Sequence, residues 1–302
     1  MKLCKPLFEI WEQSAGLEGV YKQIEKVGRV CYKSEDKITE DSAKPFVDRM
    51  IKSGHGAMLE HGTVYLQYET VKSAINPLMK YYLNKYSKVK AKEGLIGKTA
   101  RLFVTTNLRV LIENNWLKDL KYICEPTVFH EKRITVHFVC DRGVSHEFVR
   151  HRVMSFAQES TRYCNYSKKD KFGNELTFIK PCWLDIPTGH YAYWDGDWCD
   201  INKMKIQLPE GEHKDIDAFL WTLNNAETHY TLLINSGWKP QEARAVLPNS
   251  LKTELVVTGF TSDWNHFFDL RARGTTGAPH PQAKELAEPL MKEFIARKYI
   301  NN

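Results

Sequence analysis

The chain has 302 residues, of which 42% are hydrophobic and 26% are charged, and its formal net charge is +6. This length and composition exclude a mini-protein and allow a large buried core, and no apolar run approaches the roughly 18 residues of a membrane-spanning helix. The mild positive excess contains no block of five Lys and Arg residues and fits anionic small molecules at least as well as nucleic acid, so we expect neither a nucleic-acid nor a membrane partner.

The first half of the chain alternates between helical and extended patterns. Apolar residues recur at helical spacing from Leu17 to Val27, and Asn107 is placed to cap a later helix. The Lys-rich part of residues 80–98 is interpreted as a solvated helix end and loop. The expected elements are a helix at 17–30, a helix at 41–56 with an Asp/Ser cap, a strand at 62–70, a helix at about 71–86, a short strand at 101–107 and a helix at 107–120.

The clearest strand of the second half is "RITVHFVCD", residues 133–141. Its side chains alternate from Ile134 to Cys140, which predicts two distinct faces. A helix follows from about Val144, and the Trp- and Tyr-rich residues 168–212 are interpreted as an elaborated loop excursion. The other expected elements are a helix at 216–236, a short helix at 239–248, a strand at 253–260, a helix at 261–273 with a Thr/Ser cap, and a helix at 281–298. The irregular alternation predicts an α/β or α+β class.

Three adjacent basic residues, Arg150, His151 and Arg152, come at the end of the helix that follows the clearest strand. Consecutive helical side chains fan out by about 100°, so the three groups reach different anionic or acceptor groups around one helix end. Ser160 and Arg162 then offer a hydroxyl and a guanidinium on one side of an extended segment, which suits a phosphate. A solvated helix C-terminus, which basic residues also favour, is the alternative.

Further arginines fall in two separate segments. Arg244 has apolar neighbours on a short helix, and a lone guanidinium on a buried face needs an anion. Arg271 and Arg273 lie at a helix end, where either one alone is usually a surface residue.

A polar loop with His55, Glu60 and His61 separates a helix from a strand. The spacing provides no third close ligand, so we expect a loop that lines a ligand rather than a metal site. The sequence has no GxGxxG or Walker loop and no GxSxG elbow. The seven cysteines form no Cys-x-x-Cys pair and the N-terminal residues lack a secretory pattern, so we expect reduced thiols in a cytoplasmic protein.

At residues 150–163, "RHRVMSFAQESTRY" resembles the signature of flavin-dependent thymidylate synthases, which is Arg-His-Arg, seven residues, Ser, and then Arg-Tyr. The segments "GRVCYKS", "SGHGAMLEHGTVYLQY", "EARAVLPNSLKTELVVTGF" and "DWNHFFDLRAR" are similar to other parts of the family in order and spacing. The resemblance covers most of the chain and implies a single catalytic domain over 1–302, with a central, mostly antiparallel or mixed sheet flanked by helices. Insertions fall at about 86–130 and 168–212.

The resemblance also implies an activity. Family members transfer a methylene group from methylenetetrahydrofolate to dUMP and reduce it with a flavin hydride, with FAD as cofactor and NADPH as reductant, to give dTMP. No cysteine nucleophile takes part, because the flavin activates the uracil. The active sites are shared between the subunits of a homotetramer. A relative that has lost catalysis and kept nucleotide binding is an alternative.

The resemblance carries roles over to individual residues. The implied catalytic residues are Arg271, His55 and Ser160. The implied dUMP contacts are Glu147, Gln158, Glu159, Ser160, Arg162, Arg244 and Arg271. The implied FAD contacts are Ala57, Glu60, Arg150, His151, Arg152, Val153 and His266, and no metal is implied.

The chain departs from the family pattern at several of these positions. Glu147 stands where many members carry Gln, and a carboxylate cannot donate to a phosphate. Phe260 and His266 stand where some members use Asn to contact FAD. A Gly-Thr-Thr-Gly-Ala-Pro insertion follows the last arginines, which makes Arg273 a rival to Arg271 for the place beside the uracil.

Overall fold

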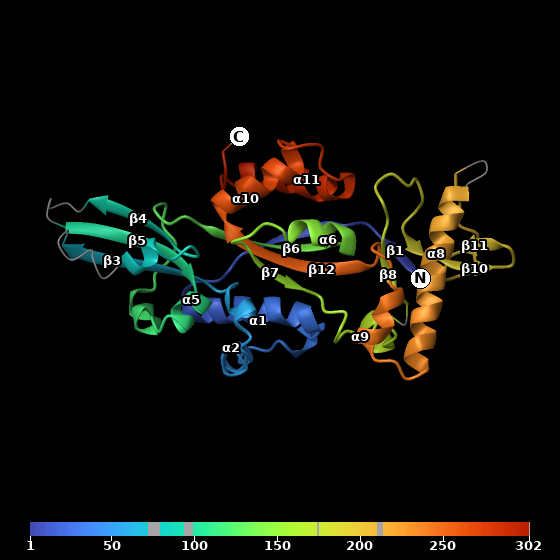
Figure 1. The fold of residues 1–302 in the computed structure, drawn as a ribbon, viewed down its shortest axis with the longest axis horizontal. Coiled ribbons are helices and arrows are strands. Elements are labelled where there is room, and N and C mark those ends of the chain that lie inside the picture. The colour runs from blue at the N-terminus through green and yellow to red at the C-terminus, as the bar shows by residue number, and fades with distance from the viewer. Residues whose placement is uncertain (72–78, 94–98, 174, 210–213, 302) are drawn as a thin grey trace.

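The computed structural model describes residues 1–71, 79–93, 99–173, 175–209 and 214–301. The molecule is elongated, with a central region between two end regions that each have a sheet of their own (Figure 1). None of the described helices combines the length and apolar character needed to cross a bilayer. The mixture of helices with mainly antiparallel sheets confirms the predicted fold class.

The central region is built on a four-stranded antiparallel sheet in the order β2-β6-β12-β7. Phe138 of β6 pairs with Leu255 of β12, and both side chains are fully buried. The predicted alternation in β6 is confirmed, because Ile134, Val136, Phe138 and Cys140 all enter one core. The strands are β2 (Leu7–Trp11), β6 (Arg133–Asp141), β7 (Ser155–Gln158) and β12 (Lys252–Phe260).

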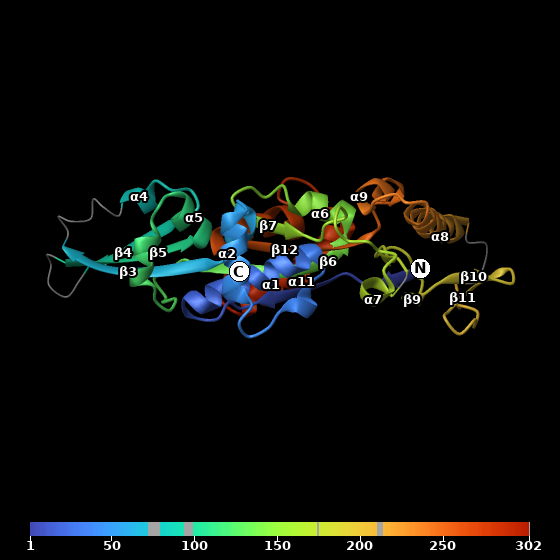
Figure 2. The ribbon, with the colours of Figure 1, turned by 90° about the horizontal axis from the view of Figure 1, so that it is seen from below.

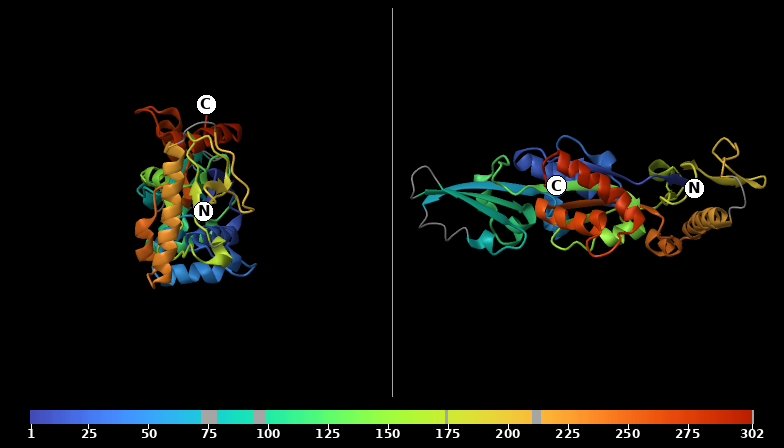
Figure 3. Two further views of the ribbon diagram at one scale, coloured as in Figure 1. Left: turned by 90° about the vertical axis from the view of Figure 1, so that its right-hand side faces the viewer. Right: turned by 90° about the horizontal axis from the view of Figure 1, so that it is seen from above.

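Helices cover both faces of this sheet. One face packs against α6 (Arg142–Phe148), α10 (Thr261–Phe268) and α11 (Pro281–Ala296), around the buried Trp264; Figure 3 shows the two C-terminal helices across it. The other face packs against α1 (Gly16–Tyr32), as Figure 2 shows from below. The face with α6, α10 and α11 is called the α10 face below, and the other the α1 face.

One end region is a three-stranded sheet of β3 (Thr63–Val71), β5 (Thr99–Asn107) and β4 (Lys88–Glu93). The loop prediction for the Lys-rich stretch was wrong, because residues 88–93 pair with β5. Of the helix expected at 71–86, the described part contains only α4 (Met79–Tyr82), Val71 belongs to β3, and residues 72–78 lie outside the described residues.

The helix after Asn107 is shorter than predicted. The cap is confirmed, because the Asn107 side chain accepts a hydrogen bond from the Val110 N–H at 3.1 Å. However, α5 (Leu108–Glu113) ends before Asn115, whose φ of 60° is left-handed and cannot continue a right-handed helix. A 3₁₀ helix (Leu117–Tyr122) follows and packs with α1, α2 (Ala43–Lys52) and β3 in the core of this region.

The other end region contains the described part of residues 168–212, which is not only a loop. They form α7 (Lys169–Phe172), β8 (Thr177–Ile179), β9 (Gly189–His190), β10 (Ala192–Trp194) and β11 (Asp197–Cys199). Both β8 and β9 pair with β1 (Lys2–Cys4) at the N-terminus. This small sheet shares an apolar core with α8 (Lys214–Asn235), which confirms the long helix predicted at 216–236.

Two predicted helix caps were wrong. The Ser42 hydroxyl does not cap α2 and instead donates to Glu25 Oε2 at 2.7 Å. At the start of α10, the Phe260 N–H donates to the Asp263 carboxylate at 3.1 Å, and the Ser262 hydroxyl donates to Glu131. In both cases the hydroxyl has a stronger partner, a carboxylate, within reach.

Candidate functional site

All predicted site residues except Gln158 and Glu159 fall into four groups. The Arg271 cluster consists of Glu147, His151, His266 and Arg271 on the α10 face. The basic turn is residues 149–154, between α6 and β7. The Ser160 loop is residues 160–163 together with Arg244. The His55–Glu60 loop contains α3 (Gly56–Leu59) and precedes β3.

The Arg271 cluster is held by one guanidinium. Arg271 Nη1 donates to Glu147 Oε2 at 2.6 Å, Nη2 donates to the Glu147 carbonyl at 2.9 Å, and Nε donates to His151 Nε2 at 3.2 Å. A π-helical turn, Asp269–Arg273, places Arg271 in this position. Arg273 is instead exposed and binds Asp269 and Asn265 beside it, so Arg271 and not Arg273 joins the other predicted residues.

His151 is neutral in this cluster. Its side chain is buried, and burial together with the charge of Arg271 and the proximity of His266 lowers the pKa of His151 to about 4. A neutral ring can accept the Arg271 hydrogen bond at Nε2, which a protonated ring cannot. Three of the five N–H groups of Arg271 are used here, which leaves two for a ligand.

The basic turn exposes two cationic side chains. Arg150 and Arg152 are exposed and have no hydrogen bond or ion pair with any described residue. Between this pair and β7, Val153 has a φ of 79° and is 38% exposed. A β-branched residue strongly disfavours the left-handed region, and a strain of this kind costs about 1–3 kcal/mol. The turn is therefore held in a conformation that the sequence alone disfavours.

The Ser160 loop presents polar groups beside the C-terminus of α1. The Ser160 N–H donates to the Cys31 carbonyl at 3.0 Å, and Arg244 Nη1 donates to Thr161 Oγ1 at 3.0 Å. Arg162 is exposed, with its guanidinium over the ring of Tyr163. The structure thus brings Ser160, Arg162 and Arg244 together. The predicted buried face around Arg244 was wrong, because Arg244 is exposed and Val246 is 38% exposed.

Glu159 and Gln158 face away from this loop. The buried Glu159 carboxylate accepts hydrogen bonds from the Tyr166 hydroxyl at 2.7 Å and from Lys252 Nζ at 3.0 Å. Gln158 Nε2 donates to the hydroxyls of Ser145 at 2.8 Å and Thr253 at 3.2 Å. Both side chains already have partners inside the chain.

Glu159 is part of a larger internal group, the Lys252 cluster, which consists of Lys33, His137, Glu159, Lys252 and Glu254. The Glu254 carboxylate binds Lys33, Lys252 and His137. Burial alone raises the pKa of Glu254, but the hydrogen bond with His137 and the charges of Lys252 and Lys33 together lower it. Burial likewise acts to lower the pKa of Lys252, but the two carboxylates raise it.

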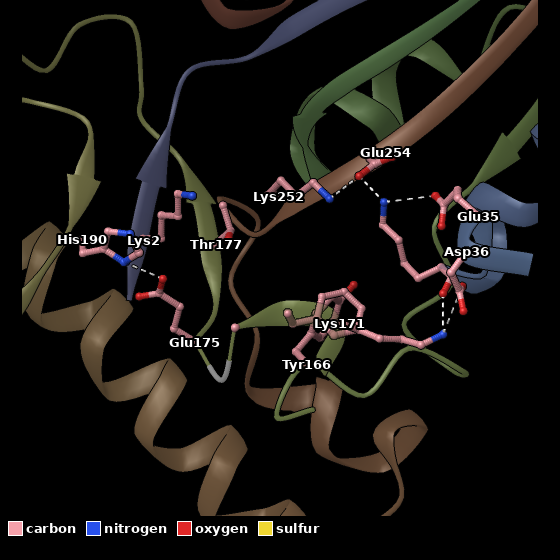
Figure 4. A pocket seen from close by; sticks show the side chains of 13 residues that line it. Lys2, Glu35, Asp36, Tyr166, Lys171, Glu175, Thr177, His190, Lys252 and Glu254 are labelled. Atoms are coloured by element: carbon pink, nitrogen blue, oxygen red, sulfur yellow. Dashed lines mark hydrogen bonds and ion pairs between the residues drawn. The ribbon is translucent and has the colours of Figure 1, made fainter. Parts of the chain in front are cut away.

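A cavity of about 850 Å³ lies beside the Lys252 cluster (Figure 4). It lies between the Lys252 cluster and the end region that contains β8 and β9, and none of its described lining residues is a predicted site residue. Its carboxylates have partners within the chain: Glu254 binds Lys33 and Lys252, and Glu175 Oε1 lies 2.6 Å from His190 Nδ1. Size alone therefore does not make this cavity the candidate site.

The His55–Glu60 loop separates its two histidines. His55 and Ala57 are exposed, whereas His61 is fully buried and its Nδ1 lies 2.8 Å from Thr258 Oγ1. Burial lowers the pKa of His61 to about 3. The Glu60 carboxylate accepts a hydrogen bond from Arg109 at 2.6 Å. Among the described residues, no three His, Cys, Asp or Glu side chains are grouped to hold a metal ion.

Two residues near these groups were missed by the sequence interpretation. Arg109 neutralises Glu60, and Arg133, at the start of β6, donates to the Glu60 carbonyl at 2.8 Å. The available signal was an arginine at the first position of a strand that is otherwise mostly apolar and buried.

Comparisons with known proteins point to one family. The family model described as "Thymidylate synthase complementing protein", Thy1, matches residues 84–297. A flavin-dependent thymidylate synthase of Pyrococcus furiosus is 30% identical over 164 residues, which cover 53% of this chain and 53% of that protein. A protein of the same name from Corynebacterium aurimucosum is 22% identical over 285 residues, 93% of this chain and 78% of that protein. The chain thus spans about half the length of the first relative.

A solved structure also aligns with the chain. It is a UMP/dUMP methylase, PolB, from Streptomyces cacaoi bound with 5-Br dUMP. The alignment covers 98% of this chain and 93% of that chain at 17% identity, with a TM-score of 0.43. A likeness at this level supports no conclusion about the site.

Proposed function

The chain belongs to the Thy1 family of thymidylate synthase complementing proteins, and from this premise we propose that it is a flavin-dependent thymidylate synthase. The proposed reaction transfers a methylene group from methylenetetrahydrofolate to dUMP and reduces it to give dTMP, with FAD as cofactor and NADPH as reductant. The observation that carries the proposal is the family match together with the segment from Arg150 to Tyr163, whose exposed arginines lie in the basic turn and the Ser160 loop.

The residues present fit a flavin dinucleotide. The free guanidinium groups of Arg150 and Arg152 are suited to a diphosphate, because they have no described anionic partner to displace. The neutral His151 and the strained Val153 adjoin them, and backbone strain of this kind is concentrated at ligand sites. We propose that His55, Ala57, Glu60 and His266 complete this site. The chemistry that FAD supplies when bound is hydride delivery.

The Ser160 loop is suited to the phosphate of dUMP. The Ser160 hydroxyl and the guanidinium groups of Arg162 and Arg244 provide a polar and doubly cationic surface beside the buried Thr161. The side chains of Glu159 and Gln158 form hydrogen bonds within the chain, to Tyr166 and Ser145 among others. We propose that they contact dUMP only if these hydrogen bonds are broken.

Arg271 is suited to the uracil. Its side chain is only 17% exposed, and in such an environment a fixed positive charge strongly stabilises negative charge that develops on a carbonyl oxygen. Glu147 cannot donate to a ligand in its ionised form, but it holds Arg271 Nη1 at 2.6 Å. We assign Glu147 the role of positioning Arg271.

The cysteines near the site support a reaction without a thiol nucleophile. Cys31 and Cys164 lie beside the Ser160 loop, and burial raises the pKa of both thiols to about 12. Burial also raises the pKa of Cys140. A thiol with so high a pKa is protonated near neutral pH and is therefore a poor nucleophile.

The arrangement of the groups supports active sites that are shared between the subunits of the proposed homotetramer. The Ser160 loop contacts α1, whereas the Arg271 cluster lies on the α10 face of the same sheet. Because these two groups lie on opposite faces of one sheet, we propose that dUMP contacts the Ser160 loop of one subunit and the Arg271 cluster of another. Mixing Arg162→Ala subunits with Arg271→Ala subunits should restore part of the activity that each variant lacks, because some mixed sites are intact. No recovery after subunit exchange would contradict sharing.

Two measurements test the proposed function. The purified protein should bind FAD and release tritium from 5-labelled dUMP when methylenetetrahydrofolate and NADPH are present. Binding of FAD and dUMP without tritium release would identify a relative that has lost catalysis. Failure to bind either ligand would contradict the proposal.

A further inference from the structure

Arg133 is a buried arginine at the first position of β6, and it is 7% exposed. Its Nη1 donates to the Glu60 carbonyl at 2.8 Å and to Thr63 Oγ1 at 3.4 Å, and its Nη2 donates to Ser155 Oγ at 3.0 Å. The guanidinium also lies over the ring of Phe260, 5.5 Å from its centroid. One side chain therefore connects β3, β7 and the end of β12.

No described carboxylate lies within ion-pair distance of Arg133, although the charges of Glu60 and Asp263 act to raise its pKa. Its hydrogen-bond acceptors are neutral oxygens, and the nearby Glu60 carboxylate is bound by Arg109. The Arg133 Nε–H has no described partner. Burial lowers the pKa of Arg133 to about 10. A buried, unpaired charge destabilises a fold by several kcal/mol, on the order of what breaking a buried ion pair costs. Stability alone therefore does not explain this arginine.

The groups that Arg133 connects are those assigned to FAD. Glu60 ends the His55–Glu60 loop, Ser155 directly follows the basic turn, and Phe260 precedes the helix that contains His266. We propose that Arg133 is a positioning residue of the flavin site: it joins the two loops that line the site and places a fixed positive charge behind them. This inference rests on the proposed function.

The shape of arginine explains why this residue type serves here. A guanidinium offers five N–H donors in a rigid planar fork, so Nη1 and Nη2 can serve two different loops at once. A lysine retains the charge but has one nitrogen, which cannot replace both contacts with the same geometry. Methionine retains much of the length and removes the charge and all the donors. The two substitutions therefore separate positioning from charge.

The test compares Arg133→Lys and Arg133→Met with wild type in FAD titrations of the apoprotein. A matched control is Arg101→Met, an exposed arginine on β5 whose ion pair with Glu69 is on the surface. We expect both Arg133 variants to bind FAD at least about tenfold more weakly, and the control to bind it normally. Amide hydrogen exchange at residues 55–62 should become faster in both Arg133 variants.

Further readouts separate this role from a merely structural one. Removal of an unpaired buried charge should leave the melting temperature of Arg133→Met apoprotein unchanged or raise it. The reduction potential of the bound flavin should fall further in Arg133→Met than in Arg133→Lys, because only lysine keeps the positive charge. If Arg133→Met does not fold, Ser155→Ala replaces it, with a smaller loss of FAD affinity expected.

The outcomes are distinguishable. Normal FAD affinity in both Arg133 variants, or weakening that only follows a lower melting temperature, would overturn the inference and leave the proposed function intact. Failure of the wild-type protein to bind FAD would overturn the proposed function and the flavin role of Arg133 with it.

Discussion

The Lys252 cluster and the Arg271 cluster both gather charged groups beside the central sheet, but they differ in what they leave free. In the Lys252 cluster, the two lysines face two buried carboxylates that are also bound by His137 and Tyr166. In the Arg271 cluster, one guanidinium meets one partly exposed carboxylate and a neutral His151, and two of its N–H groups remain. We propose that the first cluster maintains the fold and that the second is available to a ligand.

The strongest test of this contrast is Lys252→Met. The substitution leaves Glu159 and Glu254 with one cation fewer in a buried site, so we expect a loss of about 3–5 kcal/mol in the free energy of unfolding. Lys171→Met is the matched control, because Lys171 lines the same cavity but its ion pair with Asp36, at 4.0 Å, is exposed. In denaturant unfolding, the control should lose less than about 1 kcal/mol of its free energy of unfolding. Equal losses would contradict the contrast.

Arg271→Ala should have its main effect on catalysis. Loss of a charge that stabilises the developing negative charge on the uracil should lower kcat by about 10²–10³, or about 3–4 kcal/mol of barrier. Arg273→Ala, two residues further on, removes an exposed arginine that binds its own helix, so its kcat should stay near that of wild type. A larger defect in Arg273→Ala would reverse the assignment of the two arginines.

Arg162→Ala should weaken dUMP binding by about 1.5–3 kcal/mol, the scale of a lost hydrogen bond to a charged group. Because Arg162 is exposed, the melting temperature should not change. Calorimetric titration with dUMP checks the affinity, and Arg101→Ala provides an exposed arginine elsewhere as control. Unchanged affinity would remove Arg162 from the phosphate site.

The smallest effect is expected at Val153, in the basic turn between α6 and β7. Val153→Gly relieves the left-handed strain, and it should raise the free energy of unfolding by about 1 kcal/mol. Val149→Gly is the control, because Val149 has ordinary helical angles, with a φ of −68°. Glycine relieves no strain there and increases the conformational entropy of the unfolded chain, so it should lower the free energy of unfolding. If Val153→Gly lowers the free energy of unfolding as much as Val149→Gly does, the backbone of the basic turn is not strained.

Much of the fold was predictable from local patterns. The two-residue alternation of β6 and the long apolar periodicity of α8 each reflect one buried face. The secondary structure of each segment can therefore be predicted from its own residues. The pairing of β1 with β8 and β9 could not be predicted, because each strand has only two or three residues and the partners are far apart in sequence. The strand β4 was missed because its lysines are typical of a loop.

The segments of the candidate site could be singled out from the sequence, but their geometry could not. Residue types and their spacing were enough to propose the basic turn and the Ser160 loop from the segment Arg150 to Tyr163. The orientation of Arg271 depends on a π-helical turn, and the burial of Glu159 depends on Lys252, 93 residues away. Such contacts are made by tertiary packing, which no local pattern records.

The central claim is that arginines from the Ser160 loop and the Arg271 cluster act on a pyrimidine nucleotide with the aid of a bound flavin. The most direct test is dTMP formation by the wild-type protein from dUMP, methylenetetrahydrofolate and NADPH, with FAD removed and then restored. We expect turnover that disappears without FAD, returns with it, and is lost in both Arg162→Ala and Arg271→Ala. Turnover that persists without FAD, or that neither variant reduces, would contradict it.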